Sequence, residues 1–564
     1  MVSHQLLGAR VAFSPSTKAK GVRGDIRNYR PIVMTSVLRK LYERCILGPL
    51  TEKIRLDISQ NGFRDCRGTL DQVLNFDTIL RTLQQQNENA CTVLLDIKSA
   101  YDRVDRGVLW NHLFQLGITG NMLDSIKSLF NSCQLQVGVN GYLSDPFSPQ
   151  VGVLQGSVLS PLLFAVYIDS LPWNLRLLGG GLDIGEAGHI NALLFADDVA
   201  LIADSVDSMR RLLRACEDHS FRFRYKWNPV KSVVLDSDEI QTLQSPLKLY
   251  DVTISVLKSA LYLGIQVTGK GVSAKDHIEH LANRGWAAYG RFRGCGMHWH
   301  GYPARYCLTI FRIYVRPTME YGLALGCFND LALAPLAAIQ NKFITNISAW
   351  RAVNLATALF GLPSIPRRAQ ELAARFLIHC RRMNTDVLAF HTVQLPPPPS
   401  SCLEALNQNA LIQNLPPPPF TIAELSKRWG QEEREVLARS IQGIHFLPKD
   451  RRPDVSVTAV LPKTWSNALI AWRIGAMTTP HRLCASTGRR LTRKHASACS
   501  SAAIYISLRL SFEIPDESTH PFGSAIDFVF SKSLKRTWTA DCAELRVVMP
   551  LLLEIQRRCL GIDD

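Results

Sequence analysis

Two apolar segments in the first half of the chain end in aspartate. Residues 90–96 (ACTVLLD) form a short apolar run, which is typical of a buried strand. Residues 189–203 (HINALLFADDVALIA) contain two apolar runs around a tight polar turn at residues 196–198, the pattern of a β-hairpin. The pattern therefore predicts a strand and a hairpin whose polar ends carry Asp96, Asp197 and Asp198.

Helix-like and strand-like segments alternate around these strands. Apolar residues fall at helical spacing in residues 106–116, which are followed by Gly117, and again in residues 208–218. Residues 258–267 return to a strand-like pattern. This mixed order of helices and strands predicts an α+β fold.

The adjacent carboxylates of Asp197 and Asp198 need a compensating charge, because like charges repel and the burial of an anion is costly. A solvated hairpin turn, where Asp is common, would also explain them. Asp96, however, ends a separate apolar run that is far enough upstream to pair with the hairpin. Three converging carboxylates would suit Mg²⁺, which takes oxygen ligands and leaves room for phosphate and water.

The composition indicates a folded, basic protein of several domains. The chain has 564 residues, of which 46% are hydrophobic and 20% are charged, so it can bury a sizeable core. Lys and Arg number 64 against 48 Asp and Glu, a net charge of +16. This excess favours a polyanionic partner such as nucleic acid, although a basic enzyme without such a partner would have the same composition.

Cysteine spacing and the length of the apolar stretches bear on the compartment. The 14 cysteines include no C-x-x-C pair, which is typical of reduced thiols in a protein core. The first residues lack the pattern of a secretory signal, and no apolar stretch is long enough to span a membrane. We therefore expect a soluble intracellular protein, nuclear or cytoplasmic, without a membrane partner.

Seven motifs follow one another along the first half of the chain: NYRPI (28–32), QNGFR (60–64), LLDIKSAYDRV (94–104), GVLQGSVLSPLLF (152–164), FADD (195–198), NPVKS (228–232) and YLGI (262–265). In type and order they resemble the motifs of one family, the reverse transcriptases of non-LTR (LINE-type) retrotransposons. The resemblance covers roughly residues 10–380.

The resemblance implies a right-hand polymerase fold: fingers, a palm with an antiparallel sheet, and a helical thumb, followed by a mainly helical C-terminal region. We expect fingers and palm in residues 1–265, the thumb in 266–390, a proline-rich linker in 391–420 and the C-terminal region in 421–564. VRPTMEYG (315–322) and LAAIQNKF (336–343) resemble thumb helices. Arg312, Arg316 and Lys342 would contact phosphates there, or be ordinary surface charges.

The same resemblance assigns the metal site and the nucleotide gate. Asp96, Asp197 and Asp198 would bind two Mg²⁺ ions, for which Mn²⁺ could substitute. Tyr101 corresponds to the aromatic gate that crowds the sugar 2′ position and so selects deoxynucleotides. Considered without the family, Tyr101 would be a core aromatic residue on a turn.

Further residues receive substrate-binding and primer-holding roles from the resemblance. Gln155 and Gly156 resemble the pair that contacts the incoming nucleotide and the template, where a glycine allows the backbone to approach closely. Tyr262, Leu263 and Gly264 resemble the primer grip, a turn that holds the primer 3′ end in line.

Basic residues complete the site that the resemblance implies. Arg30 corresponds to the fingers arginine that grips the nucleotide triphosphate, for which a planar donor fork is suited. A lysine that the family places nearby is replaced by Ser16, so that Lys18 or Lys20 would substitute or both would be solvated loop residues. Lys231 corresponds to a lysine that protonates the departing pyrophosphate or orients the triphosphate.

The two ends of the chain depart from the family pattern. Cys484, His495 and Cys499 resemble part of a Cys-Cys-His-Cys zinc knuckle, but the second cysteine is missing. Three ligands rarely close a structural zinc site, so we assign no metal ligands there, and the sequence leaves zinc binding by these residues open. The chain also begins almost at the fingers, without the endonuclease domain of a full-length element, which predicts an N-terminally truncated copy.

These expectations combine into one function. We expect an RNA-directed DNA polymerase that adds deoxynucleoside triphosphates to the 3′-hydroxyl of a DNA primer on an RNA template, by two-metal phosphoryl transfer. The alternatives are a catalytically inactive nucleic-acid-binding remnant of such an element and a mobile-intron reverse transcriptase. The sequence leaves the oligomeric state unknown.

Overall fold

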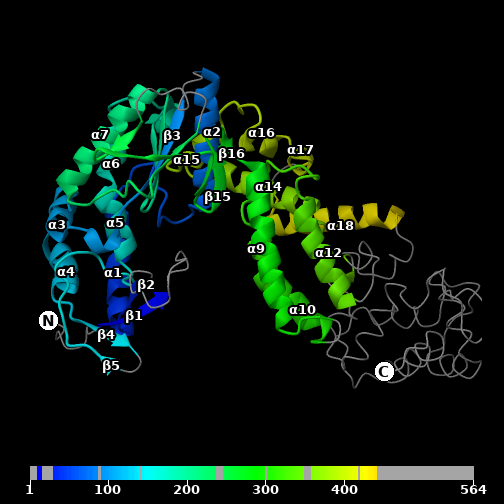
Figure 1. Cartoon of the computed structure of the whole chain (residues 1–564), viewed down its shortest axis with the longest axis horizontal. Helices are drawn as coiled ribbons and strands as arrows, with labels where there is room; N and C mark the ends of the chain where they lie inside the picture. The colour runs from blue at the N-terminus through cyan, green and yellow to red at the C-terminus, as the bar shows by residue number, and fades with distance from the viewer. Residues whose placement is uncertain are drawn as a thin grey trace, which may run out of the picture. The chain divides into compact units, whose positions relative to one another are not determined.

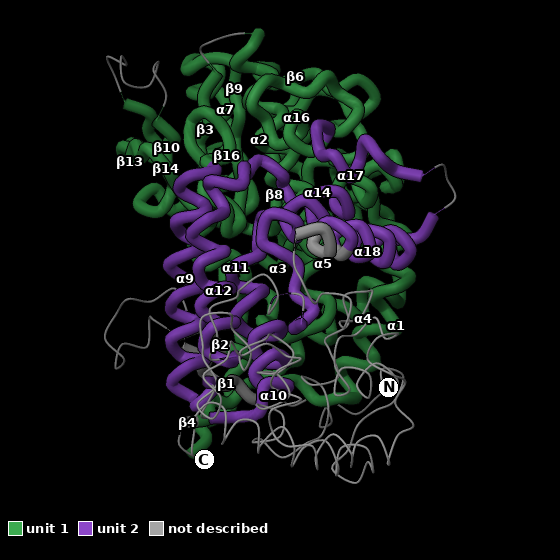
Figure 2. Tube along the Cα trace, turned by 90° about the vertical axis from the view of Figure 1, so that its right-hand side faces the viewer, with its two compact units in different colours: residues 1–273, 377–406 green, residues 274–376, 407–564 purple. Residues whose placement is uncertain are grey.

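The computed structural model describes residues 9–15, 29–86, 90–139, 142–236, 246–298, 301–348, 357, 359–416 and 420–440. The chain divides into two compact units (Figure 2): unit 1 comprises residues 1–273 and 377–406, and unit 2 comprises residues 274–376 and 407–564. This division differs from the expected boundaries at 265 and 390, because helix α14 (Ile365–Arg381) carries the chain from unit 2 back into unit 1.

Unit 1 contains a central sheet in which, among the described residues, five strands follow the order β13-β10-β3-β9-β8. Strand β3 is antiparallel to both β9 and β10, and β9 is antiparallel to β8. The strand expected at residues 90–96 and the expected hairpin are both confirmed. The strands are β3 (Cys91–Asp96), β8 (Ala192–Phe195), β9 (Asp198–Ala203), β10 (Val233–Leu235) and β13 (Ser255–Leu257).

Helices cover both faces of this sheet (Figure 1). Helix α2 (Thr69–Gln86) contacts β8 and β9, while α6 (Ser170–Arg176) contacts β8 and α7 (Val206–Phe223) contacts β3 and β9. Helix α2 and the pair α6 and α7 lie to opposite sides of β3 in Figure 1. Residues 199–203 of β9 are consequently all buried, which explains why these five positions are all apolar rather than alternating.

A second sheet and several short elements complete unit 1. The second sheet has the order β2-β1-β4-β5 and consists of β1 (Ala9–Pro15), β2 (Tyr29–Met34), β4 (Leu135–Val139) and β5 (Tyr142–Leu143). The other strands are β6 (Leu182–Asp183), β7 (His189–Ile190), β11 (Lys248–Leu249), β12 (Val252–Thr253), β14 (Ser259–Tyr262), β15 (Ile265–Thr268) and β16 (Gly271–Val272). The other helices are α1 (Val37–Lys53), η3 (Tyr101–Arg103), α3 (Arg106–Gln115), α4 (Gly120–Asn131), α5 (Ser160–Ile168), η4 (Gly185–Ala187), α15 (Leu388–Thr392) and α16 (Cys402–Asn407).

All the regular elements in the described part of unit 2 are helices. Its core is aromatic: the rings of Phe311 and Phe343 stack with centroids 3.9 Å apart, and both side chains are fully buried. The elements are α9 (Ala274–Gly294), α10 (Ala304–Ile310), the π-helix η5 (Phe311–Val315), α11 (Arg316–Glu320), η6 (Leu323–Leu325), α12 (Ala334–Ser348), the first part of α14, α17 (Ala410–Gln413) and α18 (Ile422–Ser440).

The fold therefore mixes helices and sheets as the pattern predicted. Helices α16 and α17 lie within residues 391–420, the range expected as a proline-rich linker. Within the described part of the chain, none of the helices combines the length and apolar character needed to cross a membrane. Cys484, His495 and Cys499 lie outside the described residues.

Candidate active site

The three aspartates lie at the same end of the two central strands. The register of β3 and β9 pairs Asp96 directly with Asp198, and the register of β8 and β9 pairs Phe195 with Asp198. Asp197 is the second residue of the two-residue turn between β8 and β9. Side chains directly opposite in an antiparallel pair have Cβ atoms about 5 Å apart, so Asp96 and Asp198 are neighbours although they are distant in sequence.

The chemistry of this set suits a divalent cation, because carboxylate oxygens are the ligands that Mg²⁺ prefers. The described residues nevertheless contain no preassembled group of three or more His, Cys, Asp or Glu side chains that could hold a metal ion. Adjacent residues project in different directions, and three anions repel one another. The register thus brings two of the expected ligands together, and a site made of all three stays a proposal.

The NPVKS segment is bound to Asp96. Lys231 Nζ lies 3.8 Å from Asp96 Oδ2, and the Lys231 side chain is 67% exposed. Asn228 Nδ2 donates to the same carboxylate oxygen at 3.1 Å, and the Asn228 backbone N–H donates to the Asp96 carbonyl at 2.8 Å. Asn228 therefore orients Asp96, a role that the sequence interpretation missed although the residue stands in a quoted motif.

Tyr101 begins the short helix η3 that follows β3. Its ring stacks on Phe164 with centroids 5.3 Å apart and meets the edge of Phe63 at 6.4 Å. Burial, and then the charge of Asp197, raise the pKa of the Tyr101 phenol. The ring is therefore held rigidly by other aromatic residues, and its protonated hydroxyl lies within the field of Asp197.

The loop with Gln155 and Gly156 is joined to strand β2. The Val33 N–H donates to the Gln155 carbonyl at 2.7 Å. A Cβ on Gly156, where φ is 133°, would lie 2.1 Å from the carbonyl oxygen of Val33, so only glycine fits. Gln155 Nε2 donates to Asp102 Oδ1 at 3.3 Å. The loop thus connects the Tyr101 turn to the second sheet.

Arg30 lies in β2, opposite Ser14 of β1. Its side chain is not among the described ones, so the expected contact with a triphosphate stays a prediction. Ser16, Lys18 and Lys20 lie outside the described residues.

The YLGI segment is a tight hairpin between β14 and β15. Leu263 and Gly264 have φ values of 48° and 82° and form its two-residue turn. The Tyr262 ring is buried against Phe76, with centroids 5.3 Å apart, and burial and then the charge of Asp198 raise the pKa of its phenol. Tyr262 therefore packs in the core near the carboxylates, so only the turn could hold a primer end.

Two of the three expected phosphate contacts in unit 2 are engaged elsewhere. Arg312 donates to the carbonyls of Phe360 and Gly361 at 3.1 Å each, and Arg316 pairs with Glu320. Burial lowers the pKa of the Arg312 guanidinium. Lys342 is exposed, as a phosphate contact or a plain surface lysine would be.

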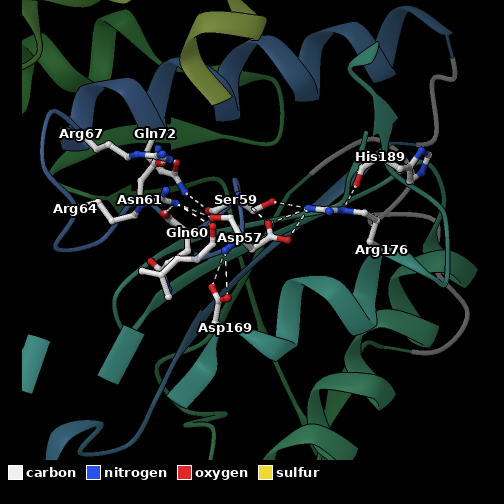
Figure 3. A network of polar contacts seen from close by, with 11 residues as sticks. Asp57, Ser59, Gln60, Asn61, Arg64, Arg67, Gln72, Asp169, Arg176 and His189 are labelled. Atoms are coloured by element: carbon white, nitrogen blue, oxygen red, sulfur yellow. Dashed lines mark hydrogen bonds and ion pairs between the residues drawn. The ribbon is translucent and has the colours of Figure 1, made fainter. Parts of the chain in front are cut away.

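A buried polar network supports the hairpin that carries Asp197 and Asp198 (Figure 3). Its glutamines and asparagine, Gln60, Asn61 and Gln72, bond to the backbone of residues 194–196. The sequence interpretation used QNGFR only as a family motif and missed this role. The run of three uncharged polar residues at 59–61 was the available signal.

The family model described as "Reverse transcriptase (RNA-dependent DNA polymerase)" matches residues 17–267. The chain is 29% identical over 212 residues to the retrovirus-related Pol polyprotein from type-2 retrotransposable element R2DM of Drosophila melanogaster. It is 32% identical over 223 residues to the Pol polyprotein from type-1 retrotransposable element R2 of Popillia japonica. It is 28% identical over 222 residues to the RNA-directed DNA polymerase from mobile element jockey of Drosophila funebris.

These alignments cover 37%, 37% and 36% of this chain, and 19%, 30% and 22% of the relatives, so the chain spans less than a third of their length. Among solved structures, apo telomerase from Candida tropicalis aligns with a TM-score of 0.40 and 12% identity, over 79% of this chain and 69% of that one. The family match covers both central strands and every motif from QNGFR to YLGI. Residues 17–267 are therefore a reverse transcriptase domain related to those of non-LTR retrotransposons.

Proposed function

We propose that this chain is an RNA-directed DNA polymerase, a nucleotidyltransferase that extends a DNA primer on an RNA template with deoxynucleoside triphosphates. The observation that carries the proposal is the register that sets Asp96 opposite Asp198, one residue from Asp197 at the hairpin turn. A reverse transcriptase domain with carboxylates at this strand end has the ligand types that phosphoryl transfer requires.

The right-hand architecture is part of the proposal. The five-stranded sheet would be the palm, the sheet containing β1, β2, β4 and β5 would belong to the fingers, and the helices of unit 2 would be the thumb. The loop at Gln155 and Gly156 supports this assignment, because it joins the turn after β3 to strand β2. A nucleotide at this junction would contact fingers and palm together.

Asp96, Asp197 and Asp198 would hold a pair of divalent cations, Mg²⁺ or Mn²⁺. The cations would activate the primer 3′-hydroxyl and stabilise charge on the triphosphate. Asn228 supports this role because its amide holds one oxygen of Asp96 in place. An oriented ligand loses less conformational freedom when a cation binds.

The neighbouring side chains would select and orient the nucleotide. Tyr101, fixed between Phe164 and Phe63, would present a rigid ring to the sugar and exclude a 2′-hydroxyl. Lys231 is largely exposed and only loosely paired with Asp96, so its ammonium group is available to donate a proton to the leaving pyrophosphate.

Primer extension with the Asp197→Asn variant tests the proposal. The amide keeps the shape of the side chain and removes its charge, so we expect extension of a DNA primer on an RNA template to fall by at least about a hundredfold at saturating Mg²⁺. The exposed Asp124 on α4 provides a matched control, Asp124→Asn, which should retain the rate of the unaltered protein.

The same assay identifies the alternative of an inactive remnant. Such a remnant would bind an RNA–DNA hybrid but show no Mg²⁺-dependent extension with the unaltered sequence. That result would refute the enzymatic proposal while leaving nucleic-acid binding in place.

A further inference from the structure

Strand β8 is the outer strand of the hairpin that carries Asp197 and Asp198, and its outer edge is hydrogen-bonded to another segment of the chain. Strand β8 is the last strand of the five-stranded sheet, so one edge needs partners. Residues 59–61 supply them: the Leu194 N–H donates to the Ser59 carbonyl, and the Asn61 N–H donates to the Leu194 carbonyl, both at 2.9 Å. This pairing places the side chain of the intervening Gln60 at the hairpin turn.

Gln60 is fully buried and its side-chain oxygen faces the turn. Oε1 accepts from the Ala196 N–H at 3.3 Å and from the Gly62 N–H at 3.0 Å. Two N–H donors on the same side fix the orientation of the amide, because its NH₂ group could accept neither bond. Gln60 therefore joins the turn directly to the segment before α2.

The conformation of the turn at Ala196 and Asp197 depends on a hydrogen-bond partner such as Gln60. Ala196 has a φ of 58°, a left-handed conformation that residues other than glycine rarely adopt, and its backbone is buried. The approach is so close that a Cβ on Gly62 would lie 2.3 Å from the Ala196 nitrogen. Asp197 is the next residue, so any relaxation of Ala196 would redirect that carboxylate.

Gln72 of α2 holds the same region from a second side (Figure 3). Its Nε2 donates to the carbonyls of Leu194 at 3.0 Å and Ser59 at 3.3 Å, and its Oε1 accepts from Asn61 Nδ2. The Leu194 carbonyl thus receives two donors, one from the backbone and one from a side chain. The network anchors both the edge of β8 and the start of the turn.

Stability alone does not explain a glutamine at position 60. Its Nε2 is buried and has no hydrogen-bond partner among the described residues, which costs free energy that an apolar side chain of the same size would not lose. What glutamine adds here is an acceptor at the Ala196 N–H. We propose that Gln60 is a positioning residue that sets the direction of Asp197, an inference that rests on the proposed polymerase function.

The test compares two buried glutamines. Gln60→Met removes the acceptor and keeps the volume, whereas Gln340→Met removes a glutamine of unit 2 that is equally buried and bonds to the Pro363 carbonyl at 2.9 Å. We expect Gln60→Met to lower kcat about tenfold with the KM for deoxynucleotide changed less than about twofold, and Gln340→Met to retain both. Equal kcat values for the two variants would overturn the proposal.

A rescue variant separates positioning from folding. Gln60→Glu keeps an oxygen acceptor in either protonation state, so kcat should return to within about threefold of the unaltered protein. A folded Gln60→Glu variant as slow as Gln60→Met would contradict the inference.

If Gln60→Met does not fold, Gln72→Met is the milder variant, because the Asn61 N–H still bonds to the Leu194 carbonyl. Gln72→Met should lower kcat about threefold. An unchanged kcat in Gln72→Met would also contradict the inference.

Mn²⁺ binding, followed by electron paramagnetic resonance without nucleic acid, keeps the two proposals distinguishable. If the unaltered protein does not extend primers, the polymerase proposal fails, but the positioning of Asp197 is still tested. The Mn²⁺ dissociation constant should rise about fivefold in Gln60→Met and remain unchanged in Gln340→Met. Equal affinities in these two variants would refute the positioning role by itself.

Discussion

Among single residues, Asp169 has an unusual carboxyl group beneath the segment that carries Gln60 (Figure 3). Both its oxygens accept from the Asp57 N–H, at 2.9 and 3.1 Å, while the Asp57 carboxylate pairs with Arg176 at 2.8 Å. Burial, and then the charge of Asp57, raise the pKa of Asp169 to about 7, while the hydrogen bond from the Asp57 N–H and the charges of Arg64 and Arg176 act in the opposite direction. Asp169 is therefore mostly neutral in the folded protein below about pH 7, where an ordinary aspartate is charged.

This raised pKa predicts a pH dependence of stability. The folded state holds a proton on Asp169 that the unfolded state has released, so the contribution is complete below the ordinary pKa of Asp and is lost as pH rises through about 7. Asp169→Asn stays neutral throughout. We expect the unfolding free energy of the unaltered protein to fall relative to this variant between about pH 4 and pH 8, as measured by urea denaturation.

Parallel pH profiles for the unaltered protein and Asp169→Asn would contradict this assignment. Asp124→Asn, on an exposed helix face, is the control and should follow the unaltered protein at every pH.

Among the elements, α2 contributes more than a cover for the sheet. Asp77, fully buried in this helix, accepts from the Val272 N–H at 2.8 Å, the Cys402 N–H at 2.8 Å and Arg81 Nε at 3.0 Å. One carboxylate thereby joins α2 to β16 and to the start of α16. This bond network explains how residues 377–406 belong to unit 1 although unit 2 interrupts the chain before them.

Asp77→Ala should therefore destabilise unit 1 strongly. The change leaves two buried N–H groups without an acceptor and Arg81 without its ion pair, so we expect a loss of about 3–5 kcal/mol in unfolding free energy, measured by chemical denaturation. Asp207 offers a control, because it pairs with Arg210 at 2.8 Å and its side chain is 80% exposed. Asp207→Ala should cost less than about 1 kcal/mol, and similar losses for both variants would argue against the role of Asp77.

At the scale of the whole molecule, charge is the dominant property. The net charge of +16 favours a polyanionic partner, whereas the candidate active site gathers carboxylates at one strand end. Attraction of a polyanion and a cluster of carboxylates are compatible, because a cation at the aspartates would reverse the local sign of the electrostatic field.

This charge predicts salt-sensitive binding of an RNA–DNA hybrid. If about six to ten phosphates are neutralised, affinity should fall by about 10³ to 10⁵ between 50 and 200 mM salt, as fluorescence anisotropy would show. Asp197→Asn should leave the slope unchanged, since it removes no phosphate contact. A binding constant independent of salt would exclude an electrostatic nucleic-acid interface.

Local sequence patterns were enough to predict the local elements and the residue types of the candidate site. Strand β3, the hairpin β8–β9 and the helices α3 and α7 follow from apolar runs, helical spacing and turn residues within short windows. The aspartates stood out for the same reason, because charged residues at the ends of apolar runs are a local anomaly. The division after residue 273 has no such local signal, since no local pattern marks where packing changes partners.

The arrangement of these parts, in contrast, depends on tertiary packing. The register of Asp96 with Asp198, the bond from Asn228 to Asp96, and the contact of Gln60 with the hairpin turn each join segments that are distant in sequence. Such hydrogen bonds depend on which chains meet when apolar surface is buried, and they leave no periodicity in the sequence. The carboxylates were therefore predictable as candidates, whereas the residues that orient them became visible only in the folded chain.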